Sequence, residues 1–256
     1  MHPPRDILGH CTISFVQLLE SDRRECGALM PNQNPTVAGP SPDETRSGYT
    51  VYNRALLSIY DLCVLGFLCR FMWRCRSRHL LELYNQHVTS NHLDVGVGTG
   101  YFLDHCRFPT HKPRITLIDL NTNSLDATRR RLSRYAPVAY RRDVLEPINL
   151  DTRPFDSVAI NGLLHCLPGT MRTKSVVFDH LKPLVNPGGV VFGCTILNKG
   201  VKKSRTAQWT MNRLNRRKVF TNLDDDLEDL RAELSKRFQQ YDVRVVGCMA
   251  LFWARK

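Results

Sequence analysis

The stretch HLDVGVGTG (92–100) decides the fold class, because a short apolar run meets three glycines at alternate positions, Gly96, Gly98 and Gly100. An apolar run that ends in glycines and continues into a helical pattern is typical of a buried strand turning tightly into a helix. Glycine lets the backbone come close to a ligand, and free N–H groups at a helix start attract an anion. The stretch therefore predicts a ligand with a carboxylate or a phosphate.

The spacing of these glycines differs from that of a dinucleotide-binding loop. Such a loop reads G-x-G-x-x-G, and its third glycine admits close packing of the helix on the strand. Tyr101 occupies that position here, and Asp94 stands two residues before the first glycine, which gives D-x-G-x-G-x-G. An acid there is placed to hold an amino group of the ligand, directly or through water. A tight turn without a ligand remains the alternative for this loop taken alone.

Short apolar runs alternate with amphipathic helical stretches after the glycine loop. The runs lie at 92–95, 114–119, 139–142, 155–161 and 190–196. Strands that alternate with helices predict a parallel sheet with helices on both faces, that is, an α/β Rossmann-like fold.

The last part of the chain breaks this alternation. Acids at 224–226 open a helix that runs to about Phe238, and basic residues near its end suit the helix dipole. Residues 241–254 then give two β-rich runs around Gly247. Consecutive strands with no helix between them pair antiparallel, so we expect the sheet to close with an antiparallel C-terminal strand.

The segments before the glycine loop differ from one another in composition. Residues 1–48 are rich in Pro, Asn and Ser without a sustained apolar period, which predicts a disordered leader and no secretory signal. Residues 49–91 carry apolar residues at helical spacing, which predicts a helical N-terminal cap. Asp61 and Arg70 lie inside the most apolar stretch, and a charge there would cost ~2.5–3.5 kcal/mol in a bilayer, so we expect no membrane span.

These patterns predict one domain over residues 49–256. The expected parts are the cap at 49–91, a cofactor-binding core at 92–197, a basic loop on the acceptor side at 198–222, and a C-terminal helix and hairpin at 223–256.

Further acids follow the next two strands. Asp119 ends the second strand, where a carboxylate can accept both hydroxyls of a ribose. Asp143 follows the third strand, where it could accept a hydrogen bond from an adenine amino group, with Leu120 and Val144 flanking the ring. Each acid alone is more often an ordinary loop residue, but three acids on three successive strand ends point to one nucleoside-like ligand.

As a set, these motifs resemble those of the class I S-adenosylmethionine-dependent methyltransferases. The resemblance covers residues 92–197 and includes the strand at 155–161 and LKPLVNPGGVV at 181–191. It implies a seven-stranded sheet, S-adenosylmethionine as the cofactor and methyl transfer as the reaction. A wider string, from YDL at 60–62 through WRC at 73–75 to LHCLPG at 164–169, is similar to the small stand-alone enzymes of fungal and bacterial secondary-metabolite pathways.

The resemblance also implies roles on the acceptor side. Asn161 follows the fourth strand and is expected beside both the cofactor and the transferred methyl group, and His165 is the candidate general base. A structural hydrogen bond at a helix start is the alternative for His165. Tyr60, Asp61 and Trp73 are candidate acceptor-pocket residues, with core packing as the alternative for Trp73.

The net charge of +12 raises a nucleic-acid alternative. Residues 199–218 hold eight basic residues and no acid, but residues 224–229 hold five acids that would repel a phosphate backbone. The Asn-Pro-Pro-Tyr signature of base methylation is also missing, since the fourth strand runs into NGLL at 161–164. We therefore expect O- or N-methylation of a small molecule, with an RNA methyltransferase as the second hypothesis and a degenerate cofactor-binding subunit as the third.

The nine cysteines are scattered without any C-x-x-C pair. This usage predicts reduced thiols in a cytoplasmic protein, and it suggests neither a metal site nor a disulfide framework.

Overall fold

The computed structural model describes residues 68–256. The predicted leader at 1–48, most of the predicted cap, and Tyr60 and Asp61 lie outside the described residues. Within the cap region, residues 68–72 are π-helical and α4 spans Ser77–His87.

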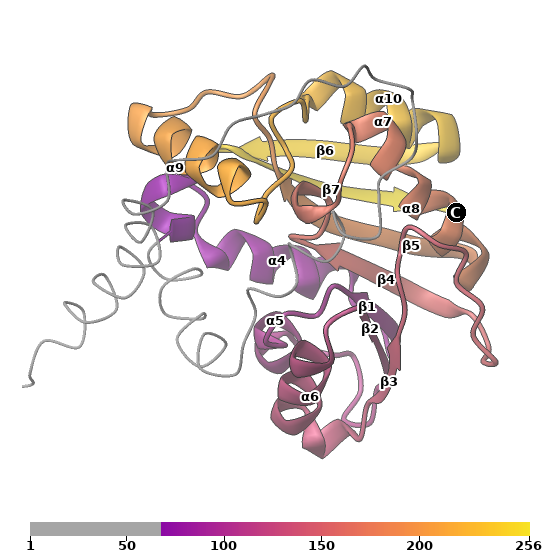
Figure 1. Cartoon of the computed structure of the whole chain (residues 1–256). Coiled ribbons are helices and arrows are strands. Elements are labelled where there is room, and N and C mark those ends of the chain that lie inside the picture. The colour runs from indigo at the N-terminus through magenta and orange to yellow at the C-terminus, as the bar shows by residue number, and fades with distance from the viewer. Residues whose placement is uncertain (1–67) are drawn as a thin grey trace, which may run out of the picture.

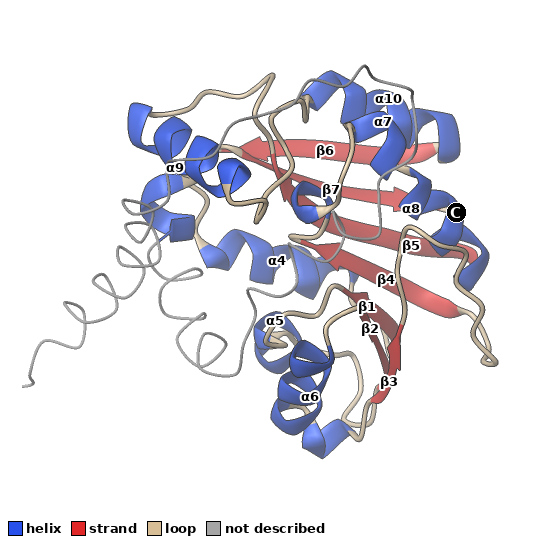
Figure 2. Cartoon of the chain, viewed as in Figure 1, coloured by secondary structure: helices blue, strands red, loops and turns tan. Residues whose placement is uncertain are grey.

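A seven-stranded sheet in the order β3-β2-β1-β4-β5-β7-β6 forms the centre of the molecule (Figure 2). Its strands are β1 (Asn91–Val95), β2 (Arg114–Asp119), β3 (Val138–Arg141), β4 (Phe155–Asn161), β5 (Val185–Ile196), β6 (Gln240–Val246) and β7 (Met249–Arg255). Neighbours from β3 to β5 pair parallel, whereas β7 pairs antiparallel with both β5 and β6. The predicted mostly parallel sheet with a reversed C-terminal strand is confirmed.

Helices cover both faces of this sheet, as predicted (Figure 1). Apolar residues of α4, α5 (Tyr101–His105), α6 (Thr122–Arg131) and α9 (Arg205–Arg216) share one core. Those of α7 (Met171–Lys174), α8 (Val176–Leu181) and α10 (Leu227–Arg237) share the other. Short 3-10 turns lie at η2 (Ser133–Tyr135), η3 (Leu164–Cys166) and η4 (Lys182–Leu184).

The prediction of a loop throughout 198–222 is wrong, because α9 occupies the middle of that segment. The Ser204 hydroxyl caps this helix by accepting a hydrogen bond from the Ala207 N–H, at 3.1 Å. Four side chains at helical spacing pack one face into the core: Ala207, Thr210, Met211 and Leu214. The basic residues of the helix, Arg205, Arg213 and Arg216, are not among these buried side chains, so the charge count concealed an ordinary amphipathic period.

An ion pair between Lys174 and Asp225 joins α7 to the segment between α9 and α10. Both side chains are fully buried, and Lys174 Nζ lies 2.9 Å from one carboxylate oxygen of Asp225. The ammonium also donates to the Thr221 carbonyl at 3.0 Å, and the Asp225 carbonyl accepts from the Lys199 N–H at 2.9 Å. Because each charge would be costly to bury alone, the pair fixes where this segment lies.

We expect Lys174→Met to lower the free energy of unfolding by about 3–5 kcal/mol, because it leaves the Asp225 carboxylate buried without a partner. Urea denaturation of the purified variant measures this loss. Lys199→Met is the matched control, since it removes the exposed ion pair with Asp224 and should change stability little. Equal losses in the two variants would contradict the assigned importance of the buried pair.

Candidate active site

The glycine loop after β1 is bent so that only its middle glycine faces open space. Gly96, Gly98 and Gly100 all have positive φ, of 73°, 54° and 73°. A Cβ on Gly96 would lie 2.9 Å from the Leu163 side chain, and one on Gly100 would lie 2.7 Å from Thr128. A Cβ on Gly98 would meet nothing within 4 Å. Close packing and positive φ together favour glycine at the first and third positions, and the second lines a space that a ligand can enter.

Asp119 lies beside this loop at the end of β2. One carboxylate oxygen accepts a hydrogen bond from the Asn121 N–H at 2.8 Å. Burial raises the pKa of the Asp119 carboxyl to about 6, although hydrogen bonds from the backbone of Asn121, Gly98 and Val97 lower it. The structure thus brings Asp119 and the glycine loop together, as the sequence predicted.

A buried polar cluster holds Asp94, the acid that precedes the glycines. The Tyr84 hydroxyl of α4 donates to Asp94 Oδ2 at 2.7 Å, and His92 Nε2 lies 3.6 Å from the same oxygen. His92 Nδ1 in turn lies 2.8 Å from the Ser157 hydroxyl of β4. Burial and the neighbouring Asp94 raise the pKa of Tyr84 well above its usual value, so the tyrosine remains a donor.

The sequence did not predict that Tyr84 forms a hydrogen bond with Asp94. Its spacing with Leu80 predicted helical packing, which is also observed, because the Tyr84 ring stacks on Phe102 at 5.5 Å between centroids. Nothing in the local pattern shows that its hydroxyl reaches a carboxylate on another element.

The residues after β3 continue the same edge of the sheet. Asp119 pairs with Arg141 across β2 and β3, which places Asp143 two residues beyond that pair. Asp143 Oδ1 accepts a hydrogen bond from the Leu145 N–H at 2.9 Å. Val144 is buried and Leu120 is half-buried. The predicted cofactor-binding residues of three successive strands therefore share one edge.

The end of β4 carries an unsatisfied polar atom at this edge. Asn161 Oδ1 is enclosed and has no hydrogen-bond partner among the described residues. Gly162 follows with a φ of 73°, and a Cβ there would lie 3.8 Å from His165 Cε1. An enclosed acceptor without a partner is costly, so this atom fits a donor supplied by a ligand.

His165 lies in η3, directly after this strand end, and is 6% exposed. Its Nδ1 accepts a hydrogen bond from the Ile196 N–H at the end of β5, at 3.3 Å. The Phe220 ring contacts it edge to face, with centroids 4.6 Å apart. The structural hydrogen bond considered from the sequence is therefore present.

Trp73 is 1% exposed and packs against Phe220, with ring centroids 5.9 Å apart. Its carbonyl accepts a hydrogen bond from the Cys248 N–H at 2.9 Å. These contacts favour the core-packing interpretation of Trp73. The other two candidate pocket residues, Tyr60 and Asp61, lie outside the described residues.

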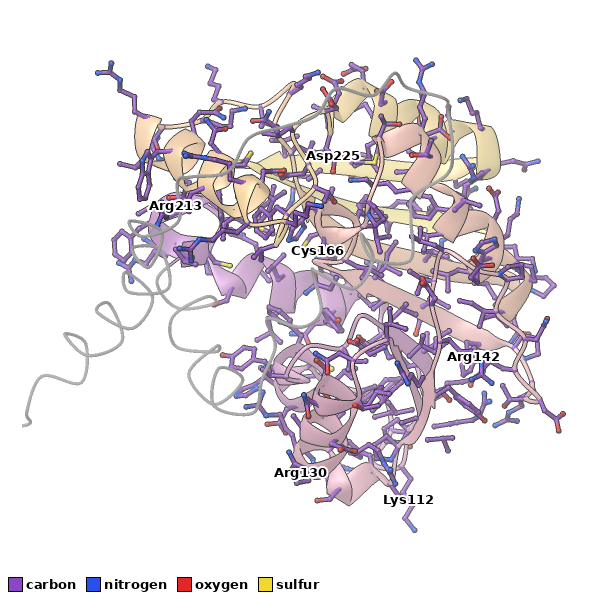
Figure 3. All side chains as sticks on the ribbon, viewed as in Figure 1. Lys112, Arg130, Arg142, Cys166, Arg213 and Asp225 are labelled. Carbon is purple, nitrogen blue, oxygen red and sulfur yellow. The ribbon has the colours of Figure 1, made fainter. Side chains whose placement is uncertain are left out.

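Positive charge is spread over separate parts of the surface. The labelled side chains Lys112 and Arg130 lie at one end of the molecule, Arg142 at one side and Arg213 toward the other end (Figure 3). Across residues 68–256, no three His, Cys, Asp or Glu side chains are grouped so that they could hold a metal ion. None of the helices formed by these residues has the length and apolar character that crossing a bilayer requires.

Comparison with known proteins agrees with this arrangement. Residues 93–191 match a methyltransferase domain family. The chain is 42% identical, over 81% of its length and 90% of the relative's, to demethylluteothin O-methyltransferase of Streptomyces thioluteus. The chain belongs to the S-adenosylmethionine-dependent methyltransferases.

Two further proteins extend this comparison. The methyltransferase is 36% identical, over 85% of its length and 98% of the relative's, to a physcion biosynthesis cluster O-methyltransferase of Aspergillus chevalieri. The solved structure of a DhpI–SAH complex shares its fold, with a TM-score of 0.60 at 16% identity, over 85% of this chain and 98% of that one.

The described residues of the methyltransferase fit its cofactor, S-adenosylmethionine. The open side of Gly98 admits a ligand against the backbone, and the Asp119 carboxylate beside it suits the paired hydroxyls of a ribose. The orphaned Asn161 Oδ1 suits an N–H or O–H donor.

We expect the affinity for S-adenosylhomocysteine to fall as the pH is lowered through about 6, the pKa of Asp119 in the free protein. Only the ionised carboxylate can accept two hydroxyls, so binding is full above this pH and loses up to about tenfold per pH unit below it. Calorimetric titration at a series of pH values measures the effect. Asp119→Asn should bind more weakly but without this pH dependence, and an unchanged pH dependence in that variant would contradict the role of Asp119.

Proposed function

We propose that this methyltransferase transfers a methyl group from S-adenosylmethionine to an oxygen or nitrogen atom of a small molecule in natural-product biosynthesis. The observation that carries the proposal is the similarity, over most of both chains, to two O-methyltransferases, one of them from a physcion biosynthesis cluster. Oxygen is accordingly the first choice of acceptor atom. Reduced thiols support a cytoplasmic location, since Cys69, Cys75 and Cys194 are buried and free.

The predicted cofactor residues take the following roles in this proposal. Asp94 and the glycine loop hold the methionine part, and Asp119 holds the ribose. Asp143 accepts a hydrogen bond from the adenine amino group, and Leu120 and Val144 flank the adenine ring. Asn161 lines the methyl-transfer end of the cofactor, and its enclosed Oδ1 can accept a hydrogen bond from an N–H or O–H group of the ligand.

The cofactor supplies a methyl group that is already activated by a positively charged sulfur. The protein's own contribution is then largely the alignment of the acceptor atom and the exclusion of water. Buried residues around the end of β4, including Leu164, His165 and Phe220, support a dry surrounding for the reaction.

An RNA methyltransferase remains the second candidate because of one feature of α9. Trp209 is 55% exposed and carries the Arg213 guanidinium 6.0 Å from its ring centroid, an arrangement that can stack on a base. The acids that follow at 224–229 oppose this candidate, since they would repel a phosphate backbone.

Calorimetric titration of S-adenosylmethionine and S-adenosylhomocysteine into the purified protein tests the cofactor assignment. We expect micromolar binding that is lost in Asp119→Ala, because the ribose loses its acceptor. NAD is the control ligand and should not bind. Binding of NAD in preference to S-adenosylmethionine would overturn the proposal.

Two further measurements separate the acceptor classes. We expect methyl transfer from labelled S-adenosylmethionine into a small-molecule fraction of a metabolite extract. We also expect that the protein shows no salt-sensitive binding to single-stranded RNA, that is, no affinity that falls steeply as the salt concentration rises. Salt-sensitive RNA binding that Arg213→Ala and Trp209→Ala weaken, together with methylated RNA, would favour the second candidate.

A further inference from the structure

The hydrogen bond to His165 fixes which of its ring nitrogens carries the proton. The Ile196 N–H donates to Nδ1, so this nitrogen must present a lone pair. A neutral imidazole has one N–H, which therefore lies on Nε2. The partner is a backbone group at the end of a central strand, so it cannot rotate away.

The surroundings of His165 keep the ring neutral. Burial, assisted by the positive charge of Lys174, lowers the pKa of His165 to about 3. A ring with its Nδ1 lone pair occupied and its Nε2 already protonated has no free site for a second proton. It can donate a hydrogen bond but is a poor base.

The Nε2 hydrogen remains available to a ligand. No described residue forms a hydrogen bond with Nε2, and the atom is not fully enclosed by the protein. The ring lies beside Gly162 at the end of β4, and the Phe220 ring packs against it. The Thr221 N–H also holds the His165 carbonyl, at 2.9 Å, so the residue is fixed at both its backbone and its ring.

The titratable groups around the ring offer no other base. Lys174 of α7 is engaged by the Asp225 carboxylate, and both are fully buried. Burial raises the pKa of the Cys166 thiol, in η3, to about 12. Ile196 of β5 and Phe220, which contact the ring, carry no titratable group. Burial raises the pKa of Asp225 to about 6, but its carboxylate is held by the Lys174 ammonium, so none of these groups is free to act as the base.

We propose that His165 donates a hydrogen bond from Nε2 to the acceptor oxygen, and that the acceptor is a hydroxyl acidic enough to enter the site as its anion. This inference rests on the proposed function. A phenol, or an enol next to a carbonyl, has the required acidity. The sequence-based assignment of His165 as a general base is replaced by that of a donor.

The reaction balances without a protein base. The acceptor hydroxyl loses its proton to solvent before it is bound. Its anionic oxygen then forms a bond to the methyl carbon as the bond from that carbon to sulfur breaks. The electron pair of the broken bond stays on sulfur, which becomes neutral, and the product is a neutral methyl ether. The Nε2–H holds and orients the oxygen until the new bond has formed.

Nitrogen-15 NMR of the histidine rings tests the tautomer directly. Protein labelled at histidine and saturated with S-adenosylhomocysteine is measured near neutral pH, and the His165 signals are assigned by their loss in His165→Gln. We expect an unprotonated Nδ1 and a protonated Nε2. A proton on Nδ1, or a charged ring, would overturn the inference without affecting the methyltransferase assignment.

Two variants distinguish a donor from a base. His165→Gln can place an amide N–H near the position of Nε2 but cannot act as a base, and His165→Leu can do neither. Methyl transfer from labelled S-adenosylmethionine into the extract fraction should fall on the order of 100-fold in His165→Leu and less than about tenfold in His165→Gln. Equal, large losses in both would identify a base and overturn the inference.

The dependence of methyl transfer on pH gives a further test, because a purely structural role of His165 would not alter it. At saturating S-adenosylmethionine, where ionisation of Asp119 no longer limits cofactor binding, we expect methyl transfer to rise with pH along a limb set by the acceptor hydroxyl. The same limb should persist in His165→Gln. Disappearance of the limb in that variant would assign it to the histidine and contradict a donor role. Calorimetry with S-adenosylhomocysteine serves as the control, since both variants should retain the affinity of the unmodified protein. Failure of the unmodified protein to bind it would instead count against the proposed function.

Discussion

The close approach of the backbone at 96–100 to its neighbours is the constraint on which the rest of the site depends. Side chains of Leu163 and Thr128 fill the positions that a Cβ on Gly96 or Gly100 would need. The chain also turns here with positive φ at all three glycines, and Gly98 faces open space. Because β1 and β2 are parallel, the same turn lies next to the end of β2 and brings Asp119 beside it.

Buried polar groups then fix the side chains around this turn from three directions. Tyr84 of α4 holds Asp94, the Ile196 N–H of β5 holds the His165 ring, and Lys174 of α7 holds Asp225. Each of these bonds satisfies a group that would be costly to bury alone. A polar site of this kind is rigid because moving any one side chain leaves its partner unsatisfied.

The meeting of the glycine loop, Asp119 and Asp143 at one sheet edge was predictable from sequence, and the contacts around His165 were not. The glycines, Asp119 and Asp143 follow their strands directly, so local patterns place them on one edge. His165 and Ile196 meet only because β4 pairs with β5, and no local pattern reveals which ring nitrogen that backbone faces. The helix within 198–222 was missed for another reason, since its basic residues concealed a buried period of small and apolar side chains.

This division has a consequence for how acceptor choice can change. The predicted cofactor-binding residues follow consecutive strands, and the close contacts at Gly96 and Gly100 disfavour larger residues there. The surroundings of His165 come from separate parts of the chain, including the segment around Phe220. The buried Lys174–Asp225 pair holds this segment in place, because Lys174 also binds the Thr221 carbonyl. Substitutions in that segment can reshape the acceptor side without disturbing the sheet edge. Because the backbone fixes His165 as a hydrogen-bond donor, such substitutions leave one requirement on the acceptor unchanged. Its oxygen must enter the site without its proton.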